Sequence, residues 1–186
     1  MDVVAICGSL RAESFNRKLL RHLAGKAGEG VTVEIVEIRG IPVYDGDLEA
    51  AAFPPEVTAL KDRIARSDAL ILASPEYNWS LPGPLKNAID WASRPGSDIP
   101  RVFGGRPTGL VGATPGPGGT RLAQAAWLPV LRTLGAVFFS DALFVAQAGS
   151  VFAESGAMVD PKTAAHAEKW ITKFVGFARR VSAGGE

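Results

Sequence analysis

The feature that most constrains the fold is an alternation between short, wholly apolar runs and longer helical patterns. Val3–Cys7 is continuously apolar and rich in β-branched residues, and it stops at Gly8. Ala69–Ala73 is a second run of the same kind. Such runs are typical of strands that are buried on both faces, as in parallel sheets. Between them lie segments whose apolar residues recur at helical spacing, which predicts amphipathic helices packed on the sheet.

These patterns predict five strands and about five helices. Strands are expected at residues 3–7, 31–38, 69–73, 108–113 and 137–144, and helices at 16–26, from Pro55 onward, and at 83–92, 120–134 and 160–181. Segments 40–54 and 94–107 are expected to be loops, and Pro129 is expected to kink or break its helix. The order predicts an α/β fold with a parallel sheet, in a single domain over residues 1–186.

The charge and cysteine content exclude several functions. Lys and Arg total 20 against 19 Asp and Glu, so a net charge of +1 gives no global reason to bind nucleic acid or an anionic membrane. The single cysteine, Cys7, excludes an internal disulfide and a multi-cysteine metal cage, and no metal site is expected. The chain shows neither a signal peptide nor an apolar run near the ~20 residues that span a bilayer, so the cytoplasm is the expected location.

Ligands in an open parallel sheet bind beyond the carboxyl ends of the strands, so the loops at those ends matter most. In the first loop, Gly8–Asn16, the residues Ser9 and Ser14 offer short polar side chains and Arg11 offers a positive charge. The unpaired N–H groups of the following helix add to an anion site. We therefore predict a phosphate site here. The simpler alternative is a helix cap by Ser14 beside a solvated Arg11.

The second loop, Ser74–Pro84, contains two aromatic residues and three prolines. This composition predicts a stiff, partly apolar surface that suits a flat ring, to which Glu76 and Asn78 can add polar contacts. The alternative is a rigid connector whose Tyr77 and Trp79 merely pack. Seen alone, the loop favours neither interpretation.

The third loop, Ala113–Arg121, is rich in glycine and proline. Its glycines would let the backbone approach a ligand closely, and Thr114 offers a hydroxyl. Alone, it is better explained by an ordinary turn that ends at a Thr120 helix cap. Together the three loops suit a phosphorylated planar ring compound, and FMN is the common one in this architecture.

Three motifs form a specific combination: Gly8-Ser9-Leu10-Arg11-x-x-Ser14-x-Asn16, Pro75-Glu76-Tyr77-Asn78, and the heptapeptide LKNAIDW at residues 85–91. This combination resembles the NADPH-dependent FMN reductase family, in order and spacing over nearly the whole chain. It looks most similar to the soluble quinone and chromate reductases of that family. The resemblance implies a flavodoxin-like three-layer sandwich, a five-stranded parallel sheet of order 2-1-3-4-5, and bound FMN.

The resemblance also assigns the site residues. The expected contacts of the FMN phosphate are Ser9, Arg11, Ser14, Phe15 and Asn16. The expected contacts of the isoalloxazine and ribityl parts are Pro75, Glu76, Tyr77 and Asn78. In relatives the third loop also closes on the ring; here it is shorter and richer in proline, and its expected contacts are Thr114, Pro115 and Gly116.

The activity that the resemblance implies is an NAD(P)H oxidoreductase acting on quinones or similar small acceptors, such as chromate, azo compounds or free flavin. NADPH or NADH would deliver hydride to flavin N5 and leave before the acceptor enters, giving ping-pong kinetics. The redox chemistry would lie on the flavin, so no catalytic protein residue is expected.

Two other classes share this architecture. A flavodoxin-type electron carrier needs FMN but has no turnover; flavodoxins are strongly acidic, and the net charge of +1 argues against that role. A hydrolase would need a nucleophile elbow, but no G-x-S-x-G occurs and neither His22 nor His166 follows a predicted strand end.

A homodimer or homotetramer is also implied by the resemblance. Trp79, Leu81, Trp91 and Phe103 lie in and around the second loop and its helix, and aromatic residues are enriched at interface cores. A two-fold arrangement would place the helix at residues 83–92 against its mate. In the alternative, Trp91 packs into the core of one subunit and Trp79 covers the flavin.

Overall fold

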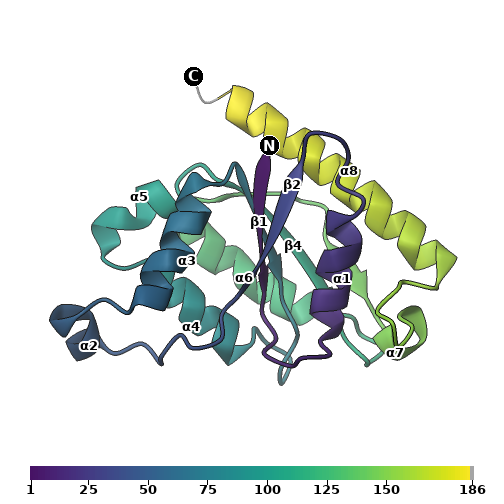
Figure 1. Cartoon of the computed structure of the whole chain (residues 1–186), viewed down its shortest axis with the longest axis horizontal. Helices are drawn as coiled ribbons and strands as arrows, with labels where there is room; N and C mark the ends of the chain where they lie inside the picture. Colours follow the sequence, from purple (N-terminus) through teal and green to yellow (C-terminus); the bar gives the residue numbers. More distant parts are fainter. Residues whose placement is uncertain (185–186) are drawn as a thin grey trace.

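The computed structural model describes residues 1–184, in which a parallel sheet lies between two layers of helices (Figure 1). The strand order is β2-β1-β3-β4-β5, and β6 also pairs with β4. The strands are β1 Asp2–Cys7, β2 Thr32–Glu37, β3 Ala69–Ala73, β4 Pro107–Ala113, β5 Val137–Phe138 and β6 Leu143–Val145. The predicted order 2-1-3-4-5 is confirmed, with one additional strand.

Helices cover both faces of the sheet. They are α1 Phe15–Ala24, α2 Gly46–Ala51, α3 Pro55–Arg66, α4 Gly83–Ala92, α5 Ile99–Val102, α6 Arg121–Thr133, α7 Ala148–Val151 and α8 Pro161–Ala183, with a 3₁₀ turn, η1, at Gly96–Asp98. Side chains of α1 and α8 form one core cluster with the sheet, and those of α3, α4 and α6 form the other. Figure 1 shows α1 and α8 on the opposite side of the sheet from α3 and α4.

The apolar character of β1 follows from these two layers. Val3 and Ala5 face the cluster beneath α1 and α8, whereas Val4 and Ile6 face the cluster beneath α3 and α4. All four side chains are at most 3% exposed. The strand β2 lies at the sheet edge, as its alternating sequence predicted.

The predicted fifth strand at residues 137–144 is wrong in one respect, because it is split into β5 and β6. The chain leaves the sheet at Phe139, whose ring packs against Trp170 and Phe174 of α8 at centroid distances of 5.8 Å. The carbonyl of Asp141 then accepts a hydrogen bond from Trp170 Nε1 at 2.8 Å. These contacts with α8 draw the segment between the two strands away from β4.

Two segments expected to be loops contain short helices. In 40–54, the Asp45 side chain caps α2 by accepting a hydrogen bond from Asp47 N at 2.9 Å. In 94–107, η1 and α5 are held by Asp98, which hydrogen-bonds Arg101 and forms an ion pair with Lys61 at 2.7 Å. These partners hold the pKa of Asp98 well below its ordinary value of 3.8. Such helices are too short to show a hydrophobic period, and the sequence pattern missed α7 for the same reason.

Of the kink or break expected at Pro129, the break does not occur, because α6 runs continuously through this residue. Proline removes one helical hydrogen bond, to the carbonyl four residues earlier. Here that residue, Ala125, is exposed, so water can bind its carbonyl. Trp127 and Leu131 are fully buried on the opposite face and keep the helix on the sheet.

Two aromatic residues considered for a subunit interface are core residues instead. Trp91 and Phe103 are 0% exposed. The indole of Trp91 packs edge-on against Tyr44 and Phe53 at 5.0 and 5.5 Å, and its Nε1 donates to the Pro42 carbonyl at 2.9 Å. The segment 40–54 therefore covers Trp91, and the alternative of core packing is confirmed for this residue.

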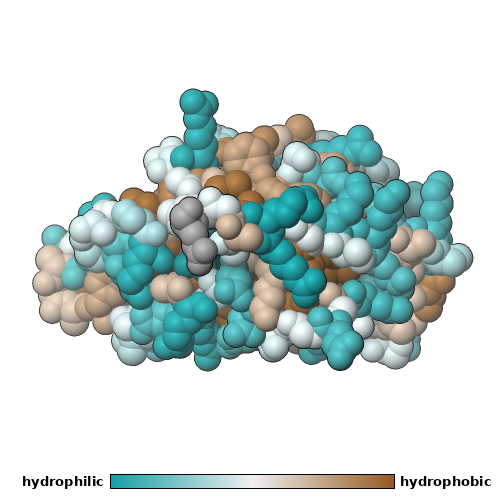
Figure 2. Space-filling model, turned by 90° about the horizontal axis from the view of Figure 1, so that it is seen from above, coloured by the Kyte–Doolittle hydropathy of each residue, from teal (hydrophilic) through white to brown (hydrophobic). Residues whose placement is uncertain are grey.

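The surface at the amino ends of the strands contains both hydrophilic and hydrophobic residues. Figure 2 views this end of the molecule, and hydrophilic residues are spread across it, with hydrophobic residues in separate patches. From Met1 to Gly184, none of the helices combines the length and the hydrophobicity that crossing a bilayer requires.

Candidate functional site

A cavity of about 240 Å³ lies at the carboxyl ends of β1, β3 and β4, the edge at which open parallel sheets bind ligands. The loops after these three strands form its walls. The lining residues are Ser9, Arg11, Ser14, Phe15, Asn16, Pro75, Glu76, Tyr77, Ala113, Thr114 and Pro115. The structure thus brings together all the predicted site residues except Asn78 and Gly116, and it adds Ala113.

The first loop presents hydrogen-bond donors to the cavity. Ser14 is the N-cap of α1 and its hydroxyl accepts from Arg17 N at 3.4 Å, while Ser9 Oγ accepts from Arg11 N at 3.4 Å. Apart from Arg11, the backbone N–H groups of residues 9–16 have no acceptor within the described part of the chain. Free N–H groups at a helix N-terminus, beside an arginine, form a site for an anion such as a phosphate.

Gly8 allows the first and second loops to approach each other. Its N–H donates to the Ala73 carbonyl at 2.9 Å. A Cβ at this position would lie 2.9 Å from that carbonyl oxygen and 2.8 Å from Leu85 Cδ2. Any other side chain would therefore push the two loops apart, and the cavity between them would change shape.

Asn16 holds the start of α1 against the end of β4. Its Nδ2 donates to the Ala113 carbonyl at 3.0 Å, and its Oδ1 accepts from Ala113 N at 2.9 Å. The side chain is 3% exposed. The amide that the sequence predicted to hold phosphate is thus engaged with the backbone of Ala113. No sequence signal points to Ala113, because an alanine contributes only its backbone here.

Glu76 joins the second loop to α6. Its Oε2 accepts hydrogen bonds from Leu122 N at 2.8 Å and Ala123 N at 3.0 Å. The N-cap of α6, Thr120, makes no side-chain capping bond, so the carboxylate of Glu76 satisfies the helix end in its place. Its negative charge also lies at the positive end of the helix dipole.

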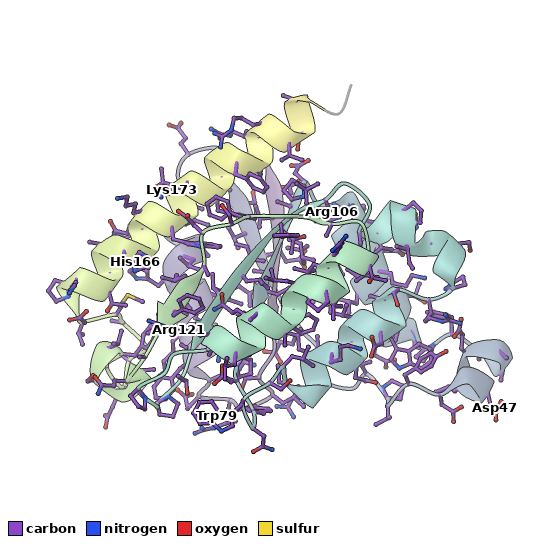
Figure 3. All side chains as sticks on the ribbon, turned by 180° about the vertical axis from the view of Figure 1, so that it is seen from behind. Asp47, Trp79, Arg106, Arg121, His166 and Lys173 are labelled. Atoms are coloured by element: carbon purple, nitrogen blue, oxygen red, sulfur yellow. The ribbon has the colours of Figure 1, made fainter. Side chains whose placement is uncertain are left out.

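The second loop turns sharply at its tip. Tyr77 N donates to the Ser80 carbonyl at 3.1 Å, and Ser80 N donates to the Tyr77 carbonyl at 3.0 Å. The two residues between them, Asn78 and Trp79, have φ of +50° and +64°. Positive φ at both central positions is the geometry of a type I′ hairpin turn. Asn78 therefore lies at the turn rather than in the cavity wall. Its neighbour Trp79 is labelled in Figure 3.

The third loop is fixed at its base. Thr114 N donates to the Val145 carbonyl, and the Thr114 carbonyl accepts from Ala148 N, both at 3.0 Å. The Thr114 hydroxyl accepts from Gly116 N at 3.3 Å. These bonds keep Thr114 and Pro115 in the cavity wall, while Gly116 lies beyond it.

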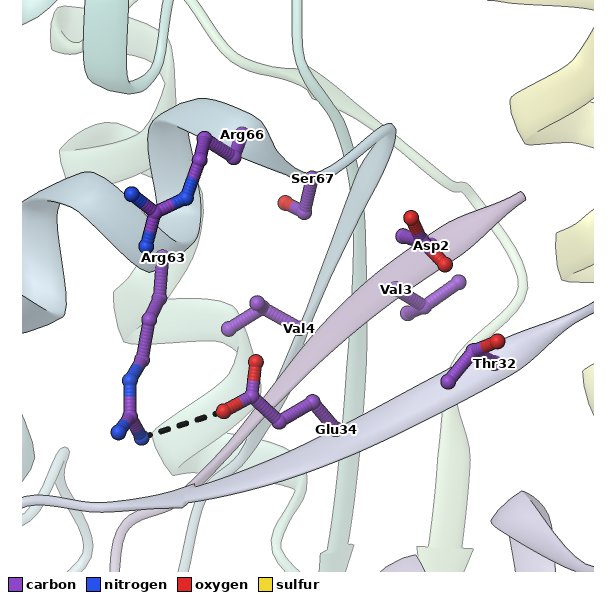
Figure 4. Close-up of a pocket in the computed structure, with 8 residues that line it drawn as sticks. All are labelled: Asp2, Val3, Val4, Thr32, Glu34, Arg63, Arg66 and Ser67. Carbon is purple, nitrogen blue, oxygen red and sulfur yellow. Dashed lines mark ion pairs between the residues drawn. The ribbon is translucent and has the colours of Figure 1, made fainter.

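A second cavity, of about 300 Å³, lies near the amino ends of β1 and β2 (Figure 4). Of its two arginines, Arg63 and Arg66, the first is paired with Glu34 at 3.2 Å. Asp2 N donates to the carboxylate of Asp68 at 2.7 Å, and the Ser67 hydroxyl donates to the Ile64 carbonyl. The cavity lies at the edge opposite to the one where parallel sheets bind ligands.

The fold is that of a flavodoxin-like α/β protein, which solved flavodoxins share, and a cavity lies at the loop after its first strand. The profile of the family described as NADPH-dependent FMN reductase matches residues 1–150. The chain belongs to this family.

Individual relatives agree with the family. The chain is 34% identical to the 2-hydroxy-1,4-benzoquinone reductase of a Burkholderia species over 180 residues, which are 96% of this chain and 97% of that protein. It is 44% identical to an NAD(P)H-dependent FMN reductase of Pseudomonas aeruginosa over 124 residues, but this match spans only 65% of that relative's length. The solved structure of FerB, a flavoenzyme NAD(P)H:(acceptor) oxidoreductase from Paracoccus denitrificans, has 37% identity and a TM-score of 0.86, and the match covers 96% of this chain and 97% of that one.

We predict that Glu76 stabilises the fold by capping α6. Glu76→Ala should lower the free energy of unfolding by about 0.5–2 kcal/mol, the usual cost of a lost helix cap. Glu76→Gln, which keeps one acceptor oxygen, should lose less. Urea unfolding measures both, with Glu154→Ala as an exposed acidic control. Equal stability of the Ala variants at 76 and 154 would contradict the capping role.

Proposed function

We propose that this protein is an FMN-dependent NAD(P)H oxidoreductase that reduces quinones and similar small acceptors, and that residues 1–186 act as one FMN-binding domain. One observation carries the proposal: three loops converge on a cavity whose first wall is a row of unpaired N–H groups beside Arg11. The family and the names of its quinone-reducing relatives support the substrate class. The proposed location is the cytoplasm, where NAD(P)H is regenerated.

The cavity suits the chemical parts of FMN. A phosphate would accept hydrogen bonds from the N–H groups of residues 9–16 and from the hydroxyls of Ser9 and Ser14, with Arg11 neutralising its charge. Because about 240 Å³ is less than the ~300–1,000 Å³ typical of pockets for whole small ligands, we place the phosphate end inside and the ring at the open side. Bound FMN would supply the redox chemistry, by taking a hydride from NAD(P)H and passing electrons to the acceptor.

The remaining residues have distinct proposed roles. Pro75 and Tyr77 would pack against the ring, and Thr114 and Pro115 would close the opposite wall. Asn78 and Gly116 lie next to these residues and would act through the backbone of their loops. Phe15, at the first turn of α1, would contribute its N–H to the phosphate. Asn16 and Glu76 are positioning residues in this scheme, since their polar atoms bind Ala113 and the start of α6.

A turnover assay distinguishes the proposed oxidoreductase from a flavodoxin-type electron carrier. The protein loaded with FMN should oxidise NAD(P)H with a benzoquinone as acceptor, and double-reciprocal plots at several acceptor concentrations should give parallel lines. Parallel lines are expected because both substrates use the same face of the ring in turn. Intersecting lines would indicate a ternary complex, and a yellow protein without turnover would favour the carrier.

Arg11 tests the phosphate assignment. Arg11→Ala should weaken FMN binding by about 1–3 kcal/mol, the loss expected for a charge-assisted hydrogen bond. Flavin fluorescence titration of the apoprotein measures this. Arg132→Ala, which removes the same charge from the far end of α6, is the control. Equal FMN affinity in both variants would reject the assignment.

We also propose a homodimer or homotetramer. Leu128 on α6 and Phe138 on β5 line one groove and are 40% and 41% exposed. Exposed apolar residues that lie together are candidates for a subunit interface. Trp91 and Phe103, which are buried in the core, contribute nothing to this surface. Light scattering should give a mass of at least two chains, and Leu128→Glu should shift it toward the monomer. A single 19.5 kDa species that binds FMN would overturn this proposal.

A further inference from the structure

Trp79 occupies a backbone position that disfavours it. Its φ of +64° lies in the left-handed region, at the second central residue of the type I′ turn. Glycine or asparagine suits this position, and a bulky residue there is strained. The turn itself therefore gives no reason for tryptophan.

Packing does not explain the residue either. Its side chain is 74% exposed, whereas Trp91, Trp127 and Trp170 are at most 2% exposed. An indole in water gains almost none of the burial energy that retains aromatic residues in a core. A residue that is both strained and exposed is a candidate for a functional contact.

The surroundings of Trp79 indicate which contact this is. Two residues before it, Tyr77 lines the cavity and is 43% exposed. Leu122 of α6 donates its N–H to Glu76, the residue before Tyr77, and is 49% exposed. The turn is closed by the reciprocal bonds between Tyr77 and Ser80, so Trp79 is held on a hydrogen-bonded support two residues from the cavity wall.

We propose that Trp79 is a specificity-determining residue that holds planar acceptors such as quinones against the open side of the cavity. This inference rests on the proposed function. A quinone is a flat, electron-poor ring, and an indole face is flat and electron-rich, so the two stack favourably. A compact octahedral acceptor such as ferricyanide has no flat face and gains nothing from the indole.

The test compares two acceptors and two variants, using menadione as the planar acceptor and ferricyanide as the control. Trp79→Asn removes the ring but suits the turn. It should lower kcat/KM for menadione about 2- to 13-fold, which corresponds to the ~0.5–1.5 kcal/mol of an aromatic pair. Its kcat/KM for ferricyanide should stay within twofold of the wild-type value. Trp79→Phe keeps a ring and should restore most of the menadione activity.

Two readouts do not depend on turnover. Titration of the oxidised FMN-loaded protein with menadione, followed by flavin absorbance without NAD(P)H, should show a matching loss of affinity in Trp79→Asn. The Tm of Trp79→Asn should equal or exceed that of the wild type, because asparagine tolerates positive φ. If Trp79 served packing or a subunit interface, its replacement by asparagine would instead lower the Tm or the particle mass.

The outcomes separate the two proposals. If Trp79→Asn keeps its menadione affinity and kcat/KM, or if both acceptors lose equally while the Tm falls, the role of Trp79 is overturned and the oxidoreductase stands. If the wild-type protein binds FMN but reduces neither acceptor, the proposed function itself fails.

Discussion

The two hydrogen bonds between the Asn16 amide and the backbone of Ala113 fix the geometry on which the cavity depends. They join the start of α1 to the end of β4, although β3 lies between β1 and β4 in the sheet. The free N–H groups of the first loop therefore face the third loop at a set distance. Without this link, the anion site and the opposite wall would belong to independently moving loops.

Glu76 plays the corresponding part on the other side of the cavity. Because its carboxylate caps the start of α6, the second loop is tied to a helix whose Trp127 Nε1 also donates to Ser74 Oγ at 2.9 Å. The three loops thus rest on hydrogen bonds to the regular elements. Such a cavity is preformed, and less ordering entropy opposes binding than in a site that must fold around its ligand.

The sequence predicts the buried strands and the long helices well because fully buried strands and amphipathic helices leave strong periodic signals. The strand order is implied by the resemblance to the family, since periodicity does not say which strands are neighbours. The position after buried strands identifies the three loops of the cavity, and the resemblance to the family adds individual residues such as Phe15 and Pro115. The sequence does not reveal what the cavity residues bind: Asn16 and Ala113 are 97 residues apart, and Glu76 and Leu122 are 46 apart. The sequence does not show whether Trp91 is a core or an interface residue, for a similar reason. The residues that cover it, Tyr44 and Phe53, lie in a segment without a clear pattern.

The split between β5 and β6 also bears on how the protein avoids aggregation. An open sheet exposes unpaired backbone groups at both edges, and these can recruit a strand from another molecule. On one side, β5 and β6 offer only two and three residues, separated by a segment held on α8. On the other side, β2 is longer but carries the exposed charges of Glu34 and Glu37. Neither edge gives a foreign strand a long, uncharged ladder to extend.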